Sequence, residues 1–140
     1  MSHTDTVTIA VDAMGGDNAP EVVLEGVAEA LAEDPRIEVL LVGPSEVVEP
    51  FASSHARCIA QPASEVIAMD EHPAEAVRRK KDSSIVVGCR AVKEGRAQGF
   101  FSAGSTGACL AGATLPASCA LQRHSFPRRS CRYGGYRGEC

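Results

Sequence analysis

Short apolar runs alternate with amphipathic stretches along the first part of the chain. Three runs, Thr6–Val11, Ile37–Val42 and Arg57–Ala60, are typical of buried strands, and the third is the weakest of them. Glu21–Glu33 places apolar residues at helical spacing between the first two runs, and Ser45 is placed to cap a shorter helix, Glu46–Ala52, before the third. This order of strands and helices predicts a parallel sheet with right-handed crossovers.

The pattern continues with more helices and a fourth strand. Pro73 suits the start of a helix over residues 74–81, and the Asp-Ser-Ser sequence that follows caps another helix, which ends at Gly95. Gly99–Gly104 predicts the fourth strand and its exit, and a final helix begins with residues 105–108.

Two of the strands lead into loops of the same kind. The first loop, Asp12–Pro20, has a glycine pair and a proline that opens the next helix, with Asp17 or Asn18 close enough to cap it. The second, Ser102–Gly107, combines glycines with hydroxyl residues. Carboxyl ends of parallel strands meet at one edge of the sheet, where open α/β sheets bind ligands. N–H and O–H donors suit anionic oxygens, so the loops predict a site for a phosphate-like group.

Both loops, and the run of basic residues at Arg78–Lys81, also have a purely structural interpretation. Many turns between strands and helices carry glycine and bind nothing. The spacing is not G-x-G-x-x-G, and no Gly-Lys-Ser/Thr follows, so the dinucleotide and Walker A fingerprints are absent. The cations of Arg78–Lys81 either complement the dipole of a helix C-terminus or form an electropositive patch beside an anionic substrate.

Composition narrows the function classes. The chain has 140 residues, 44% of them apolar and 4% aromatic with no Trp, which fits one globular domain with a core of Val, Ile, Leu and Ala. A net charge of -4 argues against a nucleic-acid partner. No apolar run of membrane-spanning length and no secretory signal are seen, so we expect a cytoplasmic protein. The cysteines form no C-x-x-C pair, so no metal site is expected, and Cys58, Cys89 and Cys109 are predicted to be buried thiols.

The character of the sequence changes after Leu115. Residues 116–140 carry five Arg and one Glu and show no helical or strand periodicity, whereas residues 1–115 are acidic. We therefore divide the chain into an α/β part, residues 1–115, and a tail, residues 116–140, which we expect to be disordered. A basic arm and a metal-binding tail are possible explanations, and a shifted reading frame near Leu115 is the one we favour.

Three stretches resemble the bacterial phosphate acyltransferases of fatty acid and phospholipid synthesis, the PlsX family. They are IAVDAMGGDNAP at Ile9–Pro20, AEAVRRKKDSS at Ala74–Ser84 and SAGSTGA at Ser102–Ala108. The family usually has Asn where Ser105 stands here. The resemblance covers residues 7–115 and leaves out more than half of the family's chain.

The resemblance implies a fold and a reaction. The fold is a three-layer α/β/α arrangement around a mostly parallel sheet, similar to that of isocitrate and isopropylmalate dehydrogenases. The reaction is the reversible formation of acyl phosphate from acyl-acyl carrier protein and orthophosphate, with no cofactor, and a glycerol-3-phosphate acyltransferase acts downstream. The family also forms homodimers and associates peripherally with the membrane through a segment that this chain lacks.

The candidate site combines the motifs. We expect the second loop to cradle phosphate, the first loop to form the opposite wall, and residues near the basic cluster to neutralise charge. The members are Ser102, Gly104, Ser105, Thr106 and Gly107 for the cradle, Asp12, Gly15, Gly16, Asp17 and Asn18 for the wall, and Lys80, Lys81, Ser83 and Ser84 for the charged side. Lys80, Lys81 and Asp12 are the candidate catalytic residues. No Ser/His/Asp or Cys/His set is evident, so positioning, rather than a covalent acyl-enzyme, is expected to supply the rate.

Two other function classes stay open. One is a nucleotide-dependent oxidoreductase on a similar sheet, which would need the dinucleotide loop that is absent. The other is a non-catalytic binding fragment, because four strands without the rest of the fold expose a sheet edge. On the same ground we expect the polypeptide as written to be inactive or unstable.

Overall fold

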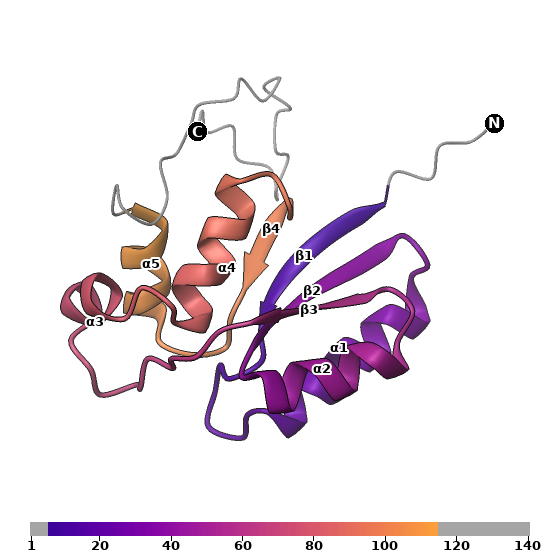
Figure 1. Cartoon of the computed structure of the whole chain (residues 1–140), viewed down its shortest axis with the longest axis horizontal. Helices are drawn as coiled ribbons and strands as arrows, with labels where there is room; N and C mark the ends of the chain where they lie inside the picture. Colours follow the sequence, from indigo (N-terminus) through magenta and orange to yellow (C-terminus); the bar gives the residue numbers. More distant parts are fainter. Residues whose placement is uncertain (1–5, 115–140) are drawn as a thin grey trace, which may run out of the picture.

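The computed structural model describes residues 6–114, and the tail predicted after Leu115 lies outside them. The described residues form a parallel four-stranded sheet in the order β3-β2-β1-β4 (Figure 1). The strands are β1 (Val7–Asp12), β2 (Ile37–Gly43), β3 (Cys58–Pro62) and β4 (Gly99–Phe101). The prediction of a parallel α/β sheet is confirmed.

Helices cover both faces of this sheet. Those of the described chain are α1 (Glu21–Glu33), α2 (Ser45–Ser54), α3 (Pro73–Arg79), α4 (Ser84–Lys93) and α5 (Thr106–Thr114). α1 and α2 lie on one face, and α3, α4 and α5 lie on the other (Figure 1). The result is the expected three-layer α/β/α arrangement.

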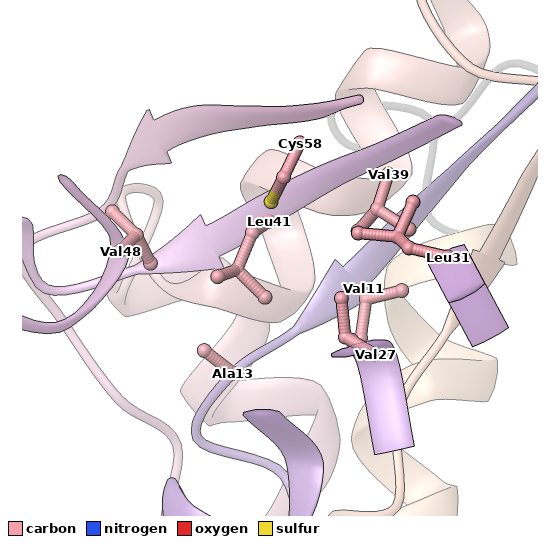
Figure 2. Close-up of a cluster of buried hydrophobic side chains, with 8 residues drawn as sticks. All are labelled: Val11, Ala13, Val27, Leu31, Val39, Leu41, Val48 and Cys58. Atoms are coloured by element: carbon pink, nitrogen blue, oxygen red, sulfur yellow. The ribbon is translucent and has the colours of Figure 1, made fainter. Parts of the chain in front are cut away.

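The first face is closed by a cluster of aliphatic side chains. Figure 2 shows Val11 of β1 beside Val27 of α1, and Val39 of β2 beside Leu31 of the same helix. Cys58 lies in the same cluster, as predicted, and burial raises the pKa of its thiol to about 11. A neutral thiol in this position behaves as a small apolar side chain.

The second face packs against α4. Ala10 and Leu40, which alternate with the residues of the first face, contact Val87 of α4. Phe100 of β4 lies over Gly88, where an added Cβ would overlap the ring carbons Cε2 and Cδ2. The glycine is therefore required for this approach of helix to strand.

Two helix starts differ from the prediction. α1 begins at Glu21 with no side-chain cap from Asp17 or Asn18; instead the Val22 N–H donates to the Asn18 backbone carbonyl at 3.3 Å. α2 begins at Ser45 itself, also without a side-chain cap. In both cases a backbone carbonyl of the preceding turn, in place of a side chain, accepts a bond from an N–H group of the first turn.

The predicted boundaries of α4 are confirmed. Ser83 accepts a hydrogen bond from the Val86 N–H at 3.4 Å, and Gly95 follows the helix with a φ of +75°. A residue in this left-handed conformation after a helix is usually glycine, because glycine has no Cβ to clash with the backbone.

Arg57 has a role that the sequence did not indicate. Its guanidinium donates to the backbone carbonyls of Leu31, of Asp34 at 2.9 Å and of Ile37 at 2.7 Å. These carbonyls lie at the end of α1 and the start of β2, where helix acceptors have no partner within the helix. Arg57 therefore closes the C-terminal end of α1 from another part of the chain.

Within the described range, none of the helices is long and apolar enough to cross a membrane.

Leu41 offers a test of the core under α1 and α2, because it is fully buried on the face of β2 that these helices cover. We expect Leu41→Ala to lower the free energy of unfolding by about 3 kcal/mol, since the cavity cannot be filled by its neighbours. Urea denaturation followed by circular dichroism measures the change. Val22→Ala, at a position that is 58% exposed, is the matched control and should cost less than about 0.5 kcal/mol. Equal losses in the two variants would contradict the assignment of the core.

Candidate phosphate-binding loops

The two glycine-containing loops meet at one edge of the sheet. β1 and β4 are parallel neighbours with Val11 opposite Phe101, so Asp12 and Ser102 leave the sheet side by side. β2 lies on the other side of β1. The strand order therefore reverses between β1 and β4, which is where open α/β sheets bind ligands. The expectation that the two loops share one edge is confirmed.

A buried carboxylate joins the loops. Asp12 is 2% exposed, and its Oδ1 accepts from the Met14 N–H at 3.0 Å while its Oδ2 accepts from the Ser102 hydroxyl at 2.8 Å. Ser102 Oγ in turn accepts from the Gly104 N–H at 3.1 Å. The carboxylate thus obtains one donor from each loop, which is what a buried charge requires.

The glycine pair is used for contact between the loops. A Cβ on Gly15 would lie 2.7 Å from Ser102 Oγ and 2.9 Å from the backbone nitrogens of Ala103 and Gly104. Gly16 has a φ of +108°, which disfavours other residues. The sequence placed Gly15 in the wall of the candidate site; in the structure the neighbouring loop occupies the space beside it.

The second loop ends in the first turn of α5. Ser105 is buried and caps this helix, because its Oγ accepts from the Ala108 N–H at 3.3 Å. Thr106 and Gly107 are exposed on the first turn. A Cβ on Gly107 would lie 2.7 Å from Pro73 Cγ, so the start of α3 lies against the start of α5.

Asp17 and Asn18 are exposed in the turn that precedes α1. They follow Gly16 directly, which places them on the same loop as the Asp12 carboxylate. Their side chains do not cap the helix.

The basic residues belong to a second cluster. Lys80 Nζ donates to Glu71 Oε1 at 2.5 Å and to the Val66 carbonyl at 2.7 Å, and Arg79 also contacts Glu71. The Lys80 ammonium holds the pKa of Glu71 below its usual value. Lys81 is exposed. Lys80 therefore ties the segment before α3 to the end of that helix.

The serine pair lies in the interior beside this cluster. Ser83 and Ser84 are buried at the start of α4, and the Ser84 N–H donates to the Glu65 carbonyl at 3.1 Å. The preceding Asp82 accepts from the N–H and the hydroxyl of Ser64, and these bonds lower its pKa. These bonds of Lys80, Asp82 and Ser84 go to residues 64–71 and not to the Asp12 loop.

Cys109 interacts with Asp12 and Ser102, whereas the sequence predicted an ordinary buried thiol at this position. It is only half-buried, and both the Ser102 hydroxyl and the Asp12 charge influence the pKa of its thiol. Burial is the main cause that raises the pKa of this thiol, with Asp12 contributing in the same direction. Its position one helical turn after Ser105 was the available signal.

Among residues 6–114, no group of three His, Cys, Asp or Glu side chains is placed to hold a metal ion.

Gly15 allows a direct test of the contact between the loops. We expect Gly15→Ala to lower the free energy of unfolding by about 2 kcal/mol, because backbone atoms of the second loop must move to admit the methyl group. Gly26→Ala is the matched control: nothing lies within 4 Å of its Cβ position in α1, so alanine should stabilise by about 0.5–1 kcal/mol. Thermal denaturation of both variants measures the difference. If Gly15→Ala is as stable as the wild type, the close approach is wrong.

The Glu71 and Asp82 carboxylates give the second cluster a pH dependence. Both pKa values are lowered in the folded chain, so their contribution is complete above the ordinary values of 4.5 and 3.8 and is lost as the pH falls through the lowered ones. We expect Glu71→Gln and Asp82→Asn to be less stable than wild type at pH 6 and to lose less stability on acidification to pH 3. Urea midpoints across this range measure the slope. Glu29→Gln, on the exposed side of α1, is the control and should keep the wild-type slope.

Comparison with known proteins confirms the resemblance. The family described as fatty acid synthesis protein matches residues 7–122. The chain is 54% identical over 112 residues to the phosphate acyltransferase of Heliobacterium modesticaldum, covering 76% of this chain and 33% of the relative. It is 55% identical over 103 residues to the phosphate acyltransferase of Limosilactobacillus reuteri, covering 74% and 30%. It thus spans about a third of the length of the curated relatives that it matches. Because the family match covers most of its residues, the chain belongs to the fatty acid synthesis protein family, in which its curated relatives are phosphate acyltransferases.

Proposed function

We propose that the β1–α1 and β4–α5 loops hold orthophosphate for transfer to an acyl group. The observation that carries the proposal is the hydrogen bond between Asp12 and Ser102, which joins the loop before α1 to the loop before α5 at one edge of the sheet. Helix N-termini present N–H donors and a partial positive charge, both of which favour a phosphate anion. The relatives' name, phosphate acyltransferase, supports phosphate as a substrate.

The proposed reaction forms acyl phosphate from acyl-acyl carrier protein. A phosphate oxygen attacks the thioester carbonyl carbon, negative charge develops on the carbonyl oxygen, and the carrier protein leaves as its thiolate. Holding the dianion in line with the carbonyl removes much of the entropic barrier, and donors directed at the developing oxyanion lower the rest. This route needs no covalent acyl-enzyme.

Thr106 and Gly107 are the residues we assign to direct phosphate contact. They are exposed on the first turn of α5, and Thr106 adds a hydroxyl donor to the backbone N–H groups. Gly16, Asp17 and Asn18 would form the opposite wall from the first loop.

Lys80 and Lys81 remain the proposed cations for the substrate. Lys81 is exposed and can approach an anion without breaking a described contact, whereas Lys80 would first have to leave Glu71. Ser83 and Ser84 are buried, so we propose for them a supporting role at the start of α4.

We propose partners on the same family basis. Acyl carrier protein would deliver the acyl chain, a second copy of the protein would form a homodimer, and a glycerol-3-phosphate acyltransferase would consume the acyl phosphate in the cytoplasm. Co-elution of the protein with acyl carrier protein, and light scattering for the dimer, would test the first two of these proposals.

Thr106 tests phosphate binding. We expect Thr106→Val to weaken orthophosphate binding about tenfold, because the isosteric side chain removes one hydrogen bond to a charged ligand. Phosphate titration of the isotope-labelled chain, followed by amide resonances, measures the dissociation constant. Thr106→Ser keeps the hydroxyl and should bind like the wild type. A chain that responds equally to phosphate and to chloride at matched ionic strength would contradict the proposed function.

A further inference from the structure

We propose that Asp12 is a positioning residue whose carboxylate accepts the one hydrogen bond that the Ser102 hydroxyl can donate. Ser102 and Gly104 then hold the shape of the second loop, while Thr106 and Gly107 face the ligand. This inference rests on the proposed function, and it divides the phosphate-binding loop into residues that hold its shape and residues that touch the anion.

The first step is the hydrogen-bond inventory of Ser102. A serine hydroxyl has one proton to donate. In the structure that proton goes to Asp12 Oδ2 at 2.8 Å, and the oxygen accepts the Gly104 N–H at 3.1 Å. Neither the Ser102 hydroxyl nor the Gly104 amide is then available to donate to a phosphate oxygen. Both groups had been candidates for the phosphate cradle on sequence grounds.

The same inventory identifies the donors that remain. At the start of α5 the Ala108 N–H donates to Ser105 Oγ, and the Cys109 N–H donates to the Ser105 carbonyl. Within the described chain, the amides of Thr106 and Gly107 precede these two and make no hydrogen bond. They are also exposed. The first turn of α5 therefore offers its donors at Thr106 and Gly107.

Asp12 can act on these donors only through Ser102. Its carboxylate is 2% exposed and accepts from Met14 and Ser102, so a ligand cannot reach it without displacing one of them. Its negative charge would also repel phosphate at close range. Fixing the second loop by a hydrogen bond uses the carboxylate without bringing it to the anion.

Cys109 provides a readout that does not require phosphate. Burial raises the pKa of its thiol, the Ser102 hydroxyl lowers it, and the Asp12 charge raises it. Asp12→Asn removes that charge and turns an amide donor toward Ser102 Oγ, which frees the hydroxyl proton for the sulfur. Ser102→Ala has the opposite effect, because the Asp12 charge loses the hydroxyl that binds it. The two variants should therefore move the reactivity of Cys109 in opposite directions.

The experiment measures iodoacetamide alkylation of Cys109 in the full chain against pH, resolved by peptide mass spectrometry. We expect Asp12→Asn to increase the rate at pH 8 about fivefold and Ser102→Ala to decrease it about twofold, since the thiolate is the reacting form. Asp34→Asn, which removes an exposed partner of Arg36, is the matched control and should leave the rate unchanged. Buried Cys58 and Cys89 report unfolding, because they would accelerate together with Cys109.

Faster alkylation of Cys109 in Asp12→Asn together with slower alkylation in Ser102→Ala supports the positioning role. If both variants accelerate Cys109, Asp12 only packs the site, and the proposal is overturned. If Asp12→Asn does not fold, Ser102→Ala alone decides, because faster alkylation in that variant is incompatible with a hydroxyl bound to the carboxylate.

A second arm uses inorganic phosphate. We expect Asp12→Asn and Ser102→Ala each to weaken phosphate binding, and the double variant to be no weaker than the worse of the two, because both break the same link. The loss of phosphate affinity caused by Thr106→Val should add to the loss caused by Ser102→Ala. If the wild-type chain binds no phosphate, the proposed function fails, whereas the alkylation result still decides the link between Asp12 and Ser102.

Discussion

The hydrogen bond from Ser102 to the buried Asp12 carboxylate is the contact on which the loop cluster depends. The ladder between β1 and β4 is only three residues long, so strand pairing alone gives the second loop a short attachment. The carboxylate adds an attachment beyond the ladder, and Gly15 permits the backbones to come close enough for it. Losing either donor would leave a buried charge short of a partner, which makes the arrangement costly to disrupt. The start of α5 is thereby fixed relative to β1.

Local sequence pattern predicts much of this fold. The bounds of α1 follow from its helical spacing and from the prolines on either side, and Ser83 and Gly95 mark the ends of α4 correctly. Capping was predicted less well. Asp17, Asn18 and Ser45 have the right chemistry, but in the first turns of α1 and α2 a backbone carbonyl, rather than a side chain, accepts a bond from an N–H group. A suitable side chain shows only that a cap is chemically possible, whereas the backbone geometry of the turn decides whether the cap forms.

The candidate site shows the same division. Both loops follow parallel strands, so their meeting at one edge could be predicted from the sequence. The pairing of β4 with β1 and the hydrogen bond from Ser102 to Asp12 could not be predicted, because both depend on contacts between residues about ninety positions apart. The basic cluster is a further example: four cations in a row predict a charged surface, but the link from Lys80 to Glu71 appears only when the segment before α3 folds back.

Arg57 has a consequence for the outer strand that it precedes. Its guanidinium binds carbonyls of α1 and β2 that lie twenty or more residues earlier in the chain. β3 is a border strand, and Ile59 on it is 53% exposed, which is the kind of strand that an intruding chain can displace. Peeling β3 away would also uncover the terminal carbonyls of α1. Arg57 thus links the exposed outer strand β3 to α1, a helix of the layer that packs on the sheet.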